Sequence, residues 1–356
     1  MPIYSLRIFS AFLIIATLIP FIKWDYWWIR IFDYPQLQKL VLILLCGIIW
    51  IKIDFDQNPI EKWIWLVVLS PAALHLFFKV KTFTSIGKKM IDSVPFEKNN
   101  GIHVLVGNVL QSNKSYYKVV SLINRISPDL VFLVETDKNW VEGICSIEEN
   151  YPNRILIPKD NTYGMALYCK LEIINSKIEY LIDDDVPSIE LEVKLRNGKV
   201  ITIYAIHPTP PVPTENLKSS ERDAEILIVG KKAKNNPKPS MVIGDLNDVA
   251  WSYTTKLFLK ISGMADPRRG RGFFSTFHAK IPLMRWPLDH IFLSKHFGLG
   301  ELKVMSGIGS DHFPICIKAS LKSEKTVEKL SASGDDKKEA EEKMVKGKIK
   351  KNKKGP

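Results

Sequence analysis

Uncharged apolar runs dominate the first eighty residues of the chain. They extend over Ile8–Ile22, Leu40–Ile51 and Trp63–Phe78. Each run is somewhat shorter than the roughly 20 residues that cross a bilayer core comfortably, but apolar flanks extend two of them. Tryptophan and lysine residues at the ends of the runs are typical of a membrane interface. The pattern predicts three transmembrane helices within residues 1–81, rather than three buried core helices of a soluble domain.

Basic residues beside these runs indicate an orientation. The N-terminus and the second loop together contain three Lys or Arg, whereas the first loop and the segment after the third run contain seven. Cytoplasmic loops of membrane proteins are enriched in Lys and Arg. We therefore expect an integral, multi-pass membrane protein whose N-terminus faces outward and whose large following domain leans toward the cytoplasm.

From about residue 102 the pattern changes to short runs rich in Val and Ile, bounded by turn residues. The predicted strands are His103–Leu110, Leu130–Glu135, Met165–Cys169, Ile189–Leu195, Val200–His207, Ser240–Gly244, Leu288–Leu293 and Ile315–Ala319. Helical periodicity intervenes at Tyr116–Ile126, Glu221–Lys234 and Thr254–Ile261. Strands mixed with helices favour an α/β sandwich in which helices cover packed sheets. We assign this domain to residues 102–321 and a juxtamembrane linker to residues 82–101.

The C-terminal segment, residues 322–356, has few large apolar side chains and many Lys, Glu, Asp, Ser and Gly. This composition predicts a disordered, Lys-rich tail. Its last lysines, between Lys346 and Lys354, are expected to contact anionic lipid if the tail lies near a membrane.

The net charge of +12 comes mostly from the two ends of the chain. In residues 100–321, 27 Lys and Arg stand against 24 Asp and Glu. Sequence-independent binding of nucleic acid depends on many phosphate contacts, so this balance disfavours a dedicated, tight DNA-binding domain. The four cysteines form no CxxC pair, which indicates structural thiols rather than a zinc site or a disulfide framework.

Acidic, amide and histidine side chains lie at the ends of the predicted strands, where loops can present them over a sheet. These residues are Asn108, Glu135, His207, Asp245, Asn247, Asp289, Asp311 and His312. Taken singly each has a bland interpretation, because Asp and Asn after a strand usually form a turn. Taken together they contain the parts of one reaction.

Hydrolysis of a phosphoester needs a hard cation held by oxygen ligands, and Glu135 with Asn108 suits Mg²⁺. It also needs a carboxylate that activates water beside an orienting amide. Asp245 and Asn247 stand two positions apart along extended backbone, which puts them on one face.

Cationic or proton-donating groups should meet the phosphoryl oxygens and the leaving group. His207 and His312 can do so, with a carboxylate such as Asp289 raising the pKa of His312. For two further candidates, a purely structural role is a stronger alternative to a catalytic one. Arg222 with Asp223 reads as a solvated helix face, and Arg268–Arg271 reads equally as a phosphate grip or a surface loop.

In this order the motifs resemble the signature of the endonuclease/exonuclease/phosphatase superfamily, and the resemblance spans residues 102–320. They are Asn108, Glu135, Gly244-Asp245-Leu246-Asn247, Leu288-Asp289-His290-Ile291-Phe292 and Ser310-Asp311-His312-Phe313-Pro314. The three apolar runs, with Ser275-Thr276-Phe277 ahead of Pro287-Leu288, further resemble bacterial membrane-anchored members.

The resemblance implies a four-layer α/β/β/α sandwich of the DNase I type and a Mg²⁺ or Mn²⁺ cofactor. It implies metal binding at Glu135, assisted by Asn108 and Asp311. Some members carry an acid where this chain has Leu110, which implies a thinner metal shell here.

The resemblance also assigns roles around the substrate. Asp245 and Asn247 would handle the nucleophilic water, and His312, paired with Asp289, would contact the phosphate. His207 matches the members that carry a second histidine.

The expected function is a membrane-anchored, metal-dependent phosphoester hydrolase, with a phosphodiesterase or nuclease as the family default. A phosphoinositide- or sphingomyelin-type phospholipid substrate is the alternative, because tethering would place the pocket close to lipid headgroups. A membrane-tethered phosphate-binding module without turnover is a third alternative. The joint presence of Asp245, Asn247 and His312 disfavours it, because binding phosphate alone needs no water-activating carboxylate.

Overall fold

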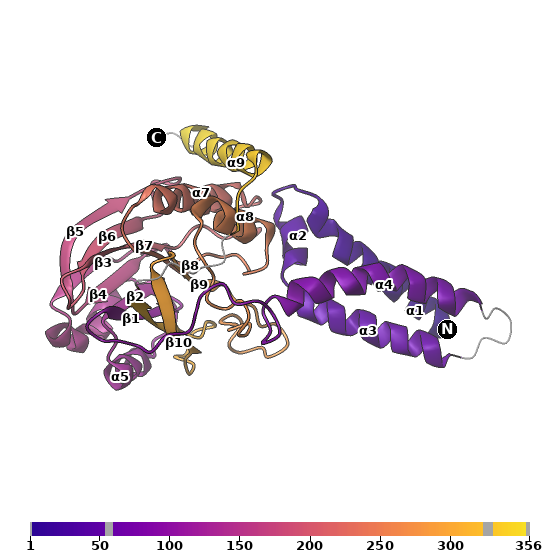
Figure 1. The fold of residues 1–356 in the computed structure, drawn as a ribbon, viewed down its shortest axis with the longest axis horizontal. Coiled ribbons are helices and arrows are strands. Elements are labelled where there is room, and N and C mark those ends of the chain that lie inside the picture. Colours follow the sequence, from indigo (N-terminus) through magenta and orange to yellow (C-terminus); the bar gives the residue numbers. More distant parts are fainter. Residues whose placement is uncertain (1, 54–59, 323–329, 354–356) are drawn as a thin grey trace.

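A computed structural model describes residues 2–53, 60–322 and 330–353. Its N-terminal part consists of helices α1 (Pro2–Leu18), α3 (Gln36–Lys52) and α4 (Ile60–Lys81). The short elements η1 (Ile19–Phe21), α2 (Trp27–Arg30) and η2 (Ile31–Asp33) connect α1 to α3. The long helices form an elongated bundle that projects from the rest of the molecule (Figure 1).

Two helical stretches, Ile3–Phe21 and Ile60–Lys81, are long and apolar enough to cross a membrane. A third qualifies only if Trp27–Asp33 and Gln36–Lys52, bent by 69° at their junction, act as one span. Among the described residues, the prediction of three transmembrane helices is therefore reduced to two candidate spans, or three if the bent pair forms one span. The cause is local: Asp33 and Pro35 lie at the bend, and the helix α3 that follows has 17 residues.

Two mixed β-sheets form the remainder. The six-stranded sheet has the order β10-β11-β1-β2-β4-β3 and the five-stranded sheet has the order β5-β6-β7-β8-β9. The strands are β1 (Gly101–Asn108), β2 (Leu130–Val134), β3 (Asn153–Ile157), β4 (Met165–Cys169), β5 (Glu172–Glu179), β6 (Ser188–Lys194), β7 (Val200–Ile206), β8 (Ser240–Asp245), β9 (Asp289–Leu293), β10 (Phe297–Val304) and β11 (Ile315–Leu321).

The sheets face one another and each carries helices on its outer side. In β1, Val104 and Val106 join the core between the sheets, whereas Leu105 points to the opposite side and packs with α5 (Tyr116–Ile126). The helix α6 (Lys138–Gly143) and the turn η3 (Cys145–Asn150) complete that outer layer.

On the other outer side, α7 (Ser220–Asn235) and α8 (Tyr253–Ser262) cover the five-stranded sheet. The ring of Phe258 on α8 lies 4.7 Å from that of Phe292 on β9. The layers are those of an α/β/β/α sandwich, and the α/β class expected from the sequence is confirmed (Figure 1).

The segment 82–101, expected to be a juxtamembrane linker, is built into the domain. Met90 and Ile91 are buried in the main core, and the amide of Val94 donates to the carbonyl of Leu299 on β10 at 2.9 Å. This segment therefore fixes the position of the bundle relative to the sandwich.

The prediction of a disordered tail is wrong for most of its length. Residues Gly334–Lys353 form helix α9, which lies along α7 (Figure 1). Ala340 and Met344 are buried against the core, and a Cβ on Gly347 would come within 2.4 Å of Ala224 on α7. Residues 323–329 and 354–356 of the predicted tail lie outside the described residues.

The connection between α1 and α3 is docked on the sandwich near one end of its sheets. The amide of Trp27 donates to the carbonyl of Leu217 at 3.0 Å, and the indole of Trp251 donates to the carbonyl of Asp33 at 2.8 Å. Trp251 therefore packs between the N-terminal part and the sandwich. The docked connection brings N-terminal residues close to the strand ends that carry the candidate chemistry.

Candidate active site

Strand pairing gathers the candidate residues at one edge of the sandwich. β1 and β2 are parallel neighbours, so Asn108, the last residue of β1, lies beside Glu135, which follows β2. In the other sheet β8 pairs with β9 so that Asp245 stands opposite Asp289. Packing the two sheets face to face brings both pairs into one buried site.

Asn108 bridges two carboxylates from different sheets. Its Nδ2 donates to Oε1 of Glu135 at 2.6 Å and to Oδ2 of Asp245 at 3.1 Å. Its Oδ1 accepts from the amide of Leu110 at 2.9 Å, which fixes the orientation of the side chain. Burial raises the pKa of both Glu135 and Asp245, because a charged carboxylate loses solvation in the interior.

His312 and Asp289 form the opposite wall of the site. Nδ1 of His312 lies 2.8 Å from Oδ2 of Asp289, and Nε2 lies 3.6 Å from Oδ2 of Asp245. Burial alone would lower the pKa of this imidazole, but the carboxylates of Asp289 and Asp245 outweigh it and raise the pKa to about 10. His312 is therefore a cation at neutral pH, and its Nε2 points to the side where Asp245 lies.

His207 lies on the third side, at the end of β7. Its Nε2 is 3.8 Å from Oδ2 of Asp245. Burial lowers the pKa of His207 despite the nearby carboxylate, so this ring is neutral when His312 is charged. The two histidines that the sequence placed in one site therefore differ in protonation state because of their surroundings.

Unusual backbone geometry holds the loop after β8. Gly244 has φ = 141°, and a Cβ there would lie 1.9 Å from the carbonyl oxygen of Ile206 on the neighbouring strand. Only glycine lets the two strands approach so closely just before Asp245. Asn247 follows with φ = 51°, its amide donating to Oδ1 of Asp245 at 2.9 Å and its Nδ2 donating to the carbonyl of Pro208 at 3.0 Å.

Arg222 supports this loop and was underrated by the sequence interpretation. It is 1% exposed rather than on a solvated helix face, and its Nη1 donates to the carbonyl of Asn247 at 2.7 Å. Asp223 and Asp248 balance its charge at 2.8 and 3.4 Å. The hydroxyl of Tyr34 donates to the same carbonyl at 3.2 Å, a contact from the N-terminal part that no motif indicated.

The arginines of residues 268–271 do not line the site. Arg268 is buried and bonds Asp266 and the ring of His290, while Arg271 donates to the carbonyl of Ile91. Both are structural, which removes the phosphate-grip interpretation for these two side chains.

Asp311 is not brought into the carboxylate cluster. It is half-buried, its Oδ1 accepts from the hydroxyl of Ser310 at 3.3 Å, and its main-chain carbonyl accepts from Ala279. It lies near enough to His312 to contribute to the raised pKa of that ring.

The remaining donor set fits a hard divalent cation. Asp245, Asp289 and His312 offer ligand atoms within 4.8 Å of one another, but Asp289 and His312 are already hydrogen-bonded together. Glu135 and Asp245 are two buried carboxylates that share the Asn108 side chain as a hydrogen-bond donor, and burial raises the pKa of both. Oxygen ligands of this kind are those that Mg²⁺ and Mn²⁺ prefer.

Comparisons with known proteins agree with this geometry. A family model described as the Endonuclease/Exonuclease/phosphatase family matches residues 105–312, more than half of the chain. The chain belongs to this family. A search of curated proteins found no significant match. The matched residues include every candidate site residue and exclude α1, α3, α4 and α9.

Solved structures show the same fold at low identity. TDP2 from D. rerio in complex with a single-strand DNA product is 17% identical, with a TM-score of 0.51 over 62% of this chain and 99% of that one. An endonuclease/exonuclease/phosphatase from Bacteroides vulgatus is 18% identical, with a TM-score of 0.51 and the same coverage. The catalytic domain of human Nocturnin with bound sulfate is 16% identical, with a TM-score of 0.51 over 64% of this chain and 96% of that one.

The His312–Asp289 contact predicts a titration that can be followed without activity. In metal-free protein we expect the His312 ring to stay protonated up to about pH 10. In Asp289→Asn it should lose its proton at lower pH, because a neutral amide no longer stabilises the imidazolium. NMR of the histidine ring protons measures both curves, with His312→Ala identifying the resonance. An unchanged midpoint in Asp289→Asn would contradict the assigned pairing.

Proposed function

We propose that this chain is a membrane-anchored, metal-dependent phosphoester hydrolase of the phosphodiesterase type. The observation that carries the proposal is the Asn108 bridge between Glu135 and Asp245, with the charged His312 on the far side of Asp245. A phosphoryl group placed between them would meet a base, a cation and a metal-binding carboxylate at once. Family membership supports the same class of reaction.

Glu135 would hold the metal, and Asn108, which donates to Glu135 and to Asp245, would position both carboxylates. When bound, Mg²⁺ or Mn²⁺ supplies Lewis-acid stabilisation of negative charge on the phosphoryl oxygens. Asp311, half-buried and outside the carboxylate cluster, is left without a proposed ligand role.

Asp245 would accept a proton from the attacking water, and its raised pKa makes it a stronger base than an exposed carboxylate. The water oxygen forms a bond to phosphorus while one ester P–O bond breaks. The His312 imidazolium would stabilise the non-bridging oxygens and return a proton to the leaving oxygen. Asn247, held by Arg222 and Pro208, would orient the water, and neutral His207 would donate a hydrogen bond to the phosphoryl group.

A turnover screen with metal removal tests the proposal. Purified full-length protein with Mg²⁺ or Mn²⁺ is assayed on DNA, RNA, phospholipids and chromogenic phosphodiesters. The DNA product bound to D. rerio TDP2 makes single-stranded DNA a natural first substrate. We expect hydrolysis that EDTA abolishes and added metal restores. Undiminished turnover in EDTA would rule out the metal role.

The membrane anchor is part of the proposal and has its own test. The docked connection between α1 and α3 requires that this loop and the catalytic domain share one side of the membrane. The excess of Lys and Arg on this side favours the cytoplasm as its location. We expect protease added outside sealed cells to leave residues after Lys98 intact. Digestion of these residues by protease from outside would show that the catalytic domain faces outward.

A further inference from the structure

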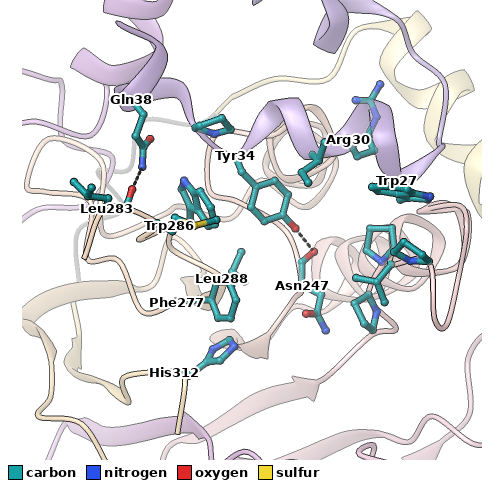
Figure 2. A pocket seen from close by; sticks show the side chains of 17 residues that line it. Trp27, Arg30, Tyr34, Gln38, Asn247, Phe277, Leu283, Trp286, Leu288 and His312 are labelled. Atoms are coloured by element: carbon teal, nitrogen blue, oxygen red, sulfur yellow. Dashed lines mark hydrogen bonds between the residues drawn. The ribbon is translucent and has the colours of Figure 1, made fainter. Parts of the chain in front are cut away.

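A cavity of about 550 Å³ lies between the N-terminal part and the candidate active site. Asn247 and His312 form its inner end, and Trp27, Ile31 and Tyr34 form the wall contributed by the N-terminal part (Figure 2). Its volume is in the range of small-molecule sites. The cavity therefore joins the proposed phosphate position to the end of the helical bundle.

The residues that line the cavity are mostly apolar, and a polyanion such as a nucleic acid would gain little from such a lining. Arg30 and His312 are the charged residues among those that line the cavity. Arg30 is committed, since its Nε donates to the carbonyl of Trp24 at 2.9 Å and its Nη1 bonds Asp33 at 3.1 Å. Grooves that stack nucleic-acid bases on aromatic rings also carry cations that follow the backbone. Here the aromatic rings are present, but the cations among the lining residues are only the committed Arg30 and the single His312 at the inner end.

The outer rim of the cavity lies at the base of the candidate membrane helices. The side chain of Gln38, in the first turn of α3, donates to the carbonyl of Leu283 at 2.9 Å, which holds an exposed loop beside that helix (Figure 2). Leu283 is 83% exposed, Ile31 52% and Met284 48%, and all three line the cavity. A group of exposed apolar side chains of this kind is typical of a binding or membrane-contacting surface.

We propose that this cavity binds the apolar chain of a lipid phosphoester, so that the substrate enters from the membrane with its phosphate at His312 and Asn247. The inference rests on the proposed hydrolase function and narrows its substrate to an amphiphilic ester. It gives the docked N-terminal segment a role in forming half of the substrate site. The chemical step is the hydrolysis described above, with one P–O ester bond broken and one formed to water.

A chain-length series tests the proposal independently of headgroup. Full-length protein reconstituted in phosphatidylcholine vesicles is assayed on methyl, butyl and octyl esters of p-nitrophenyl phosphate. The variants are Ile31→Asp, in the cavity wall, and Ile174→Asp, a matched isoleucine on β5 that is 48% exposed. The longer esters partition into the bilayer to the same extent whether wild type or a variant is assayed. Differences in turnover between the variants therefore report on the cavity.

We expect Ile31→Asp to lower the ratio of kcat/KM for the octyl ester to kcat/KM for the methyl ester by about tenfold or more, because a carboxylate in this apolar wall opposes entry of an apolar chain. Ile174→Asp should match the wild type on every ester. A second cavity variant, Met284→Asp, lies outside the N-terminal segment and should repeat the effect of Ile31→Asp. Agreement between the two variants separates loss of chain binding from disturbed docking of the N-terminal segment.

Equal octyl-ester turnover in both cavity variants and the control would overturn the proposal while leaving the hydrolase function intact. Cleavage of single-stranded DNA by wild-type protein, with no dependence on ester chain length, would replace the lipid by a nucleic acid. Failure of wild-type protein to cleave any ester, lipid or DNA would instead refute the proposed function itself.

Discussion

Asp245→Asn should reduce kcat/KM for phosphoester hydrolysis by about a hundredfold or more, with little loss of folded protein. The amide keeps the size of the side chain and can still accept from the amide of Asn247, but it cannot take a proton from water. His312→Ala should cost about as much, because it removes the cation that faces the phosphoryl oxygens. Steady-state kinetics of metal-loaded protein measures both losses.

The matched control for His312→Ala is His296→Ala, a half-buried histidine far from the cluster whose ring bonds Ser294. We expect its kcat/KM to equal that of the wild type. Circular dichroism of each variant separates loss of chemistry from loss of fold. A His312→Ala enzyme as active as His296→Ala would show that the site is not catalytic.

The sequence predicted strands and helices well where their burial is complete. All eight predicted strands and all three predicted helices of the sandwich are present within a few residues of their expected bounds. The three strands that escaped prediction, β3, β5 and β10, are edge strands. Their residues are partly exposed and mix charges with apolar side chains, so the pattern that marks a buried strand is weak there.

The candidate site could be predicted as far as its motifs extend. Asn108, Glu135, His207, Asp245, Asn247, Asp289 and His312 converge in the structure, while their individual roles stay proposals. Tyr34 was missed and Arg222 was underrated for the same physical reason. Both act through the carbonyl of Asn247, and a contact to backbone leaves no requirement on the sequence near the acceptor.

The Lys- and Glu-rich composition of residues 334–353 led to a prediction of disorder, although this segment contains signals of a helix. Ser333 caps it, its hydroxyl accepting from the amide of Asp336 at 3.1 Å while Asp336 accepts from the amide of Ser333 at 2.8 Å. Ala340, Met344 and Gly347 follow at helical spacing and form the narrow stripe that meets α7. A stripe of three small or flexible residues among lysines is too slight to separate from disorder without the partner helix.

Lysines of α9 also act within the protein. Nζ of Lys343 lies 3.0 Å from Oδ1 of Asp25 and 2.9 Å from Oδ2 of Asp223, and Lys346 pairs with Asp25 as well. Burial would raise the pKa of Asp25, but these lysines hold it below its usual value. Lys346, one of the lysines expected to contact anionic lipid, thus pairs with Asp25 in the loop between α1 and α2. Through Lys343, α9 also links that loop to Asp223 on α7.

Lys343→Met should release α9 from the sandwich. Methionine keeps an apolar stem but leaves Asp25 and Asp223 without their shared cation. We expect a cost of about 2 kcal/mol in the free energy of docking α9. This is below the range for breaking an isolated buried ion pair, because Arg222 still pairs with Asp223 and Lys346 with Asp25. Amide hydrogen exchange in residues 336–349 should then become roughly thirtyfold faster, since each 1.4 kcal/mol is about a factor of ten. Lys337→Met, an exposed lysine of the same helix, is the matched control and should exchange like the wild type. Equal protection of α9 in Lys343→Met and Lys337→Met would mean that the apolar stripe alone holds the helix and that the buried lysine does not link the two parts of the chain.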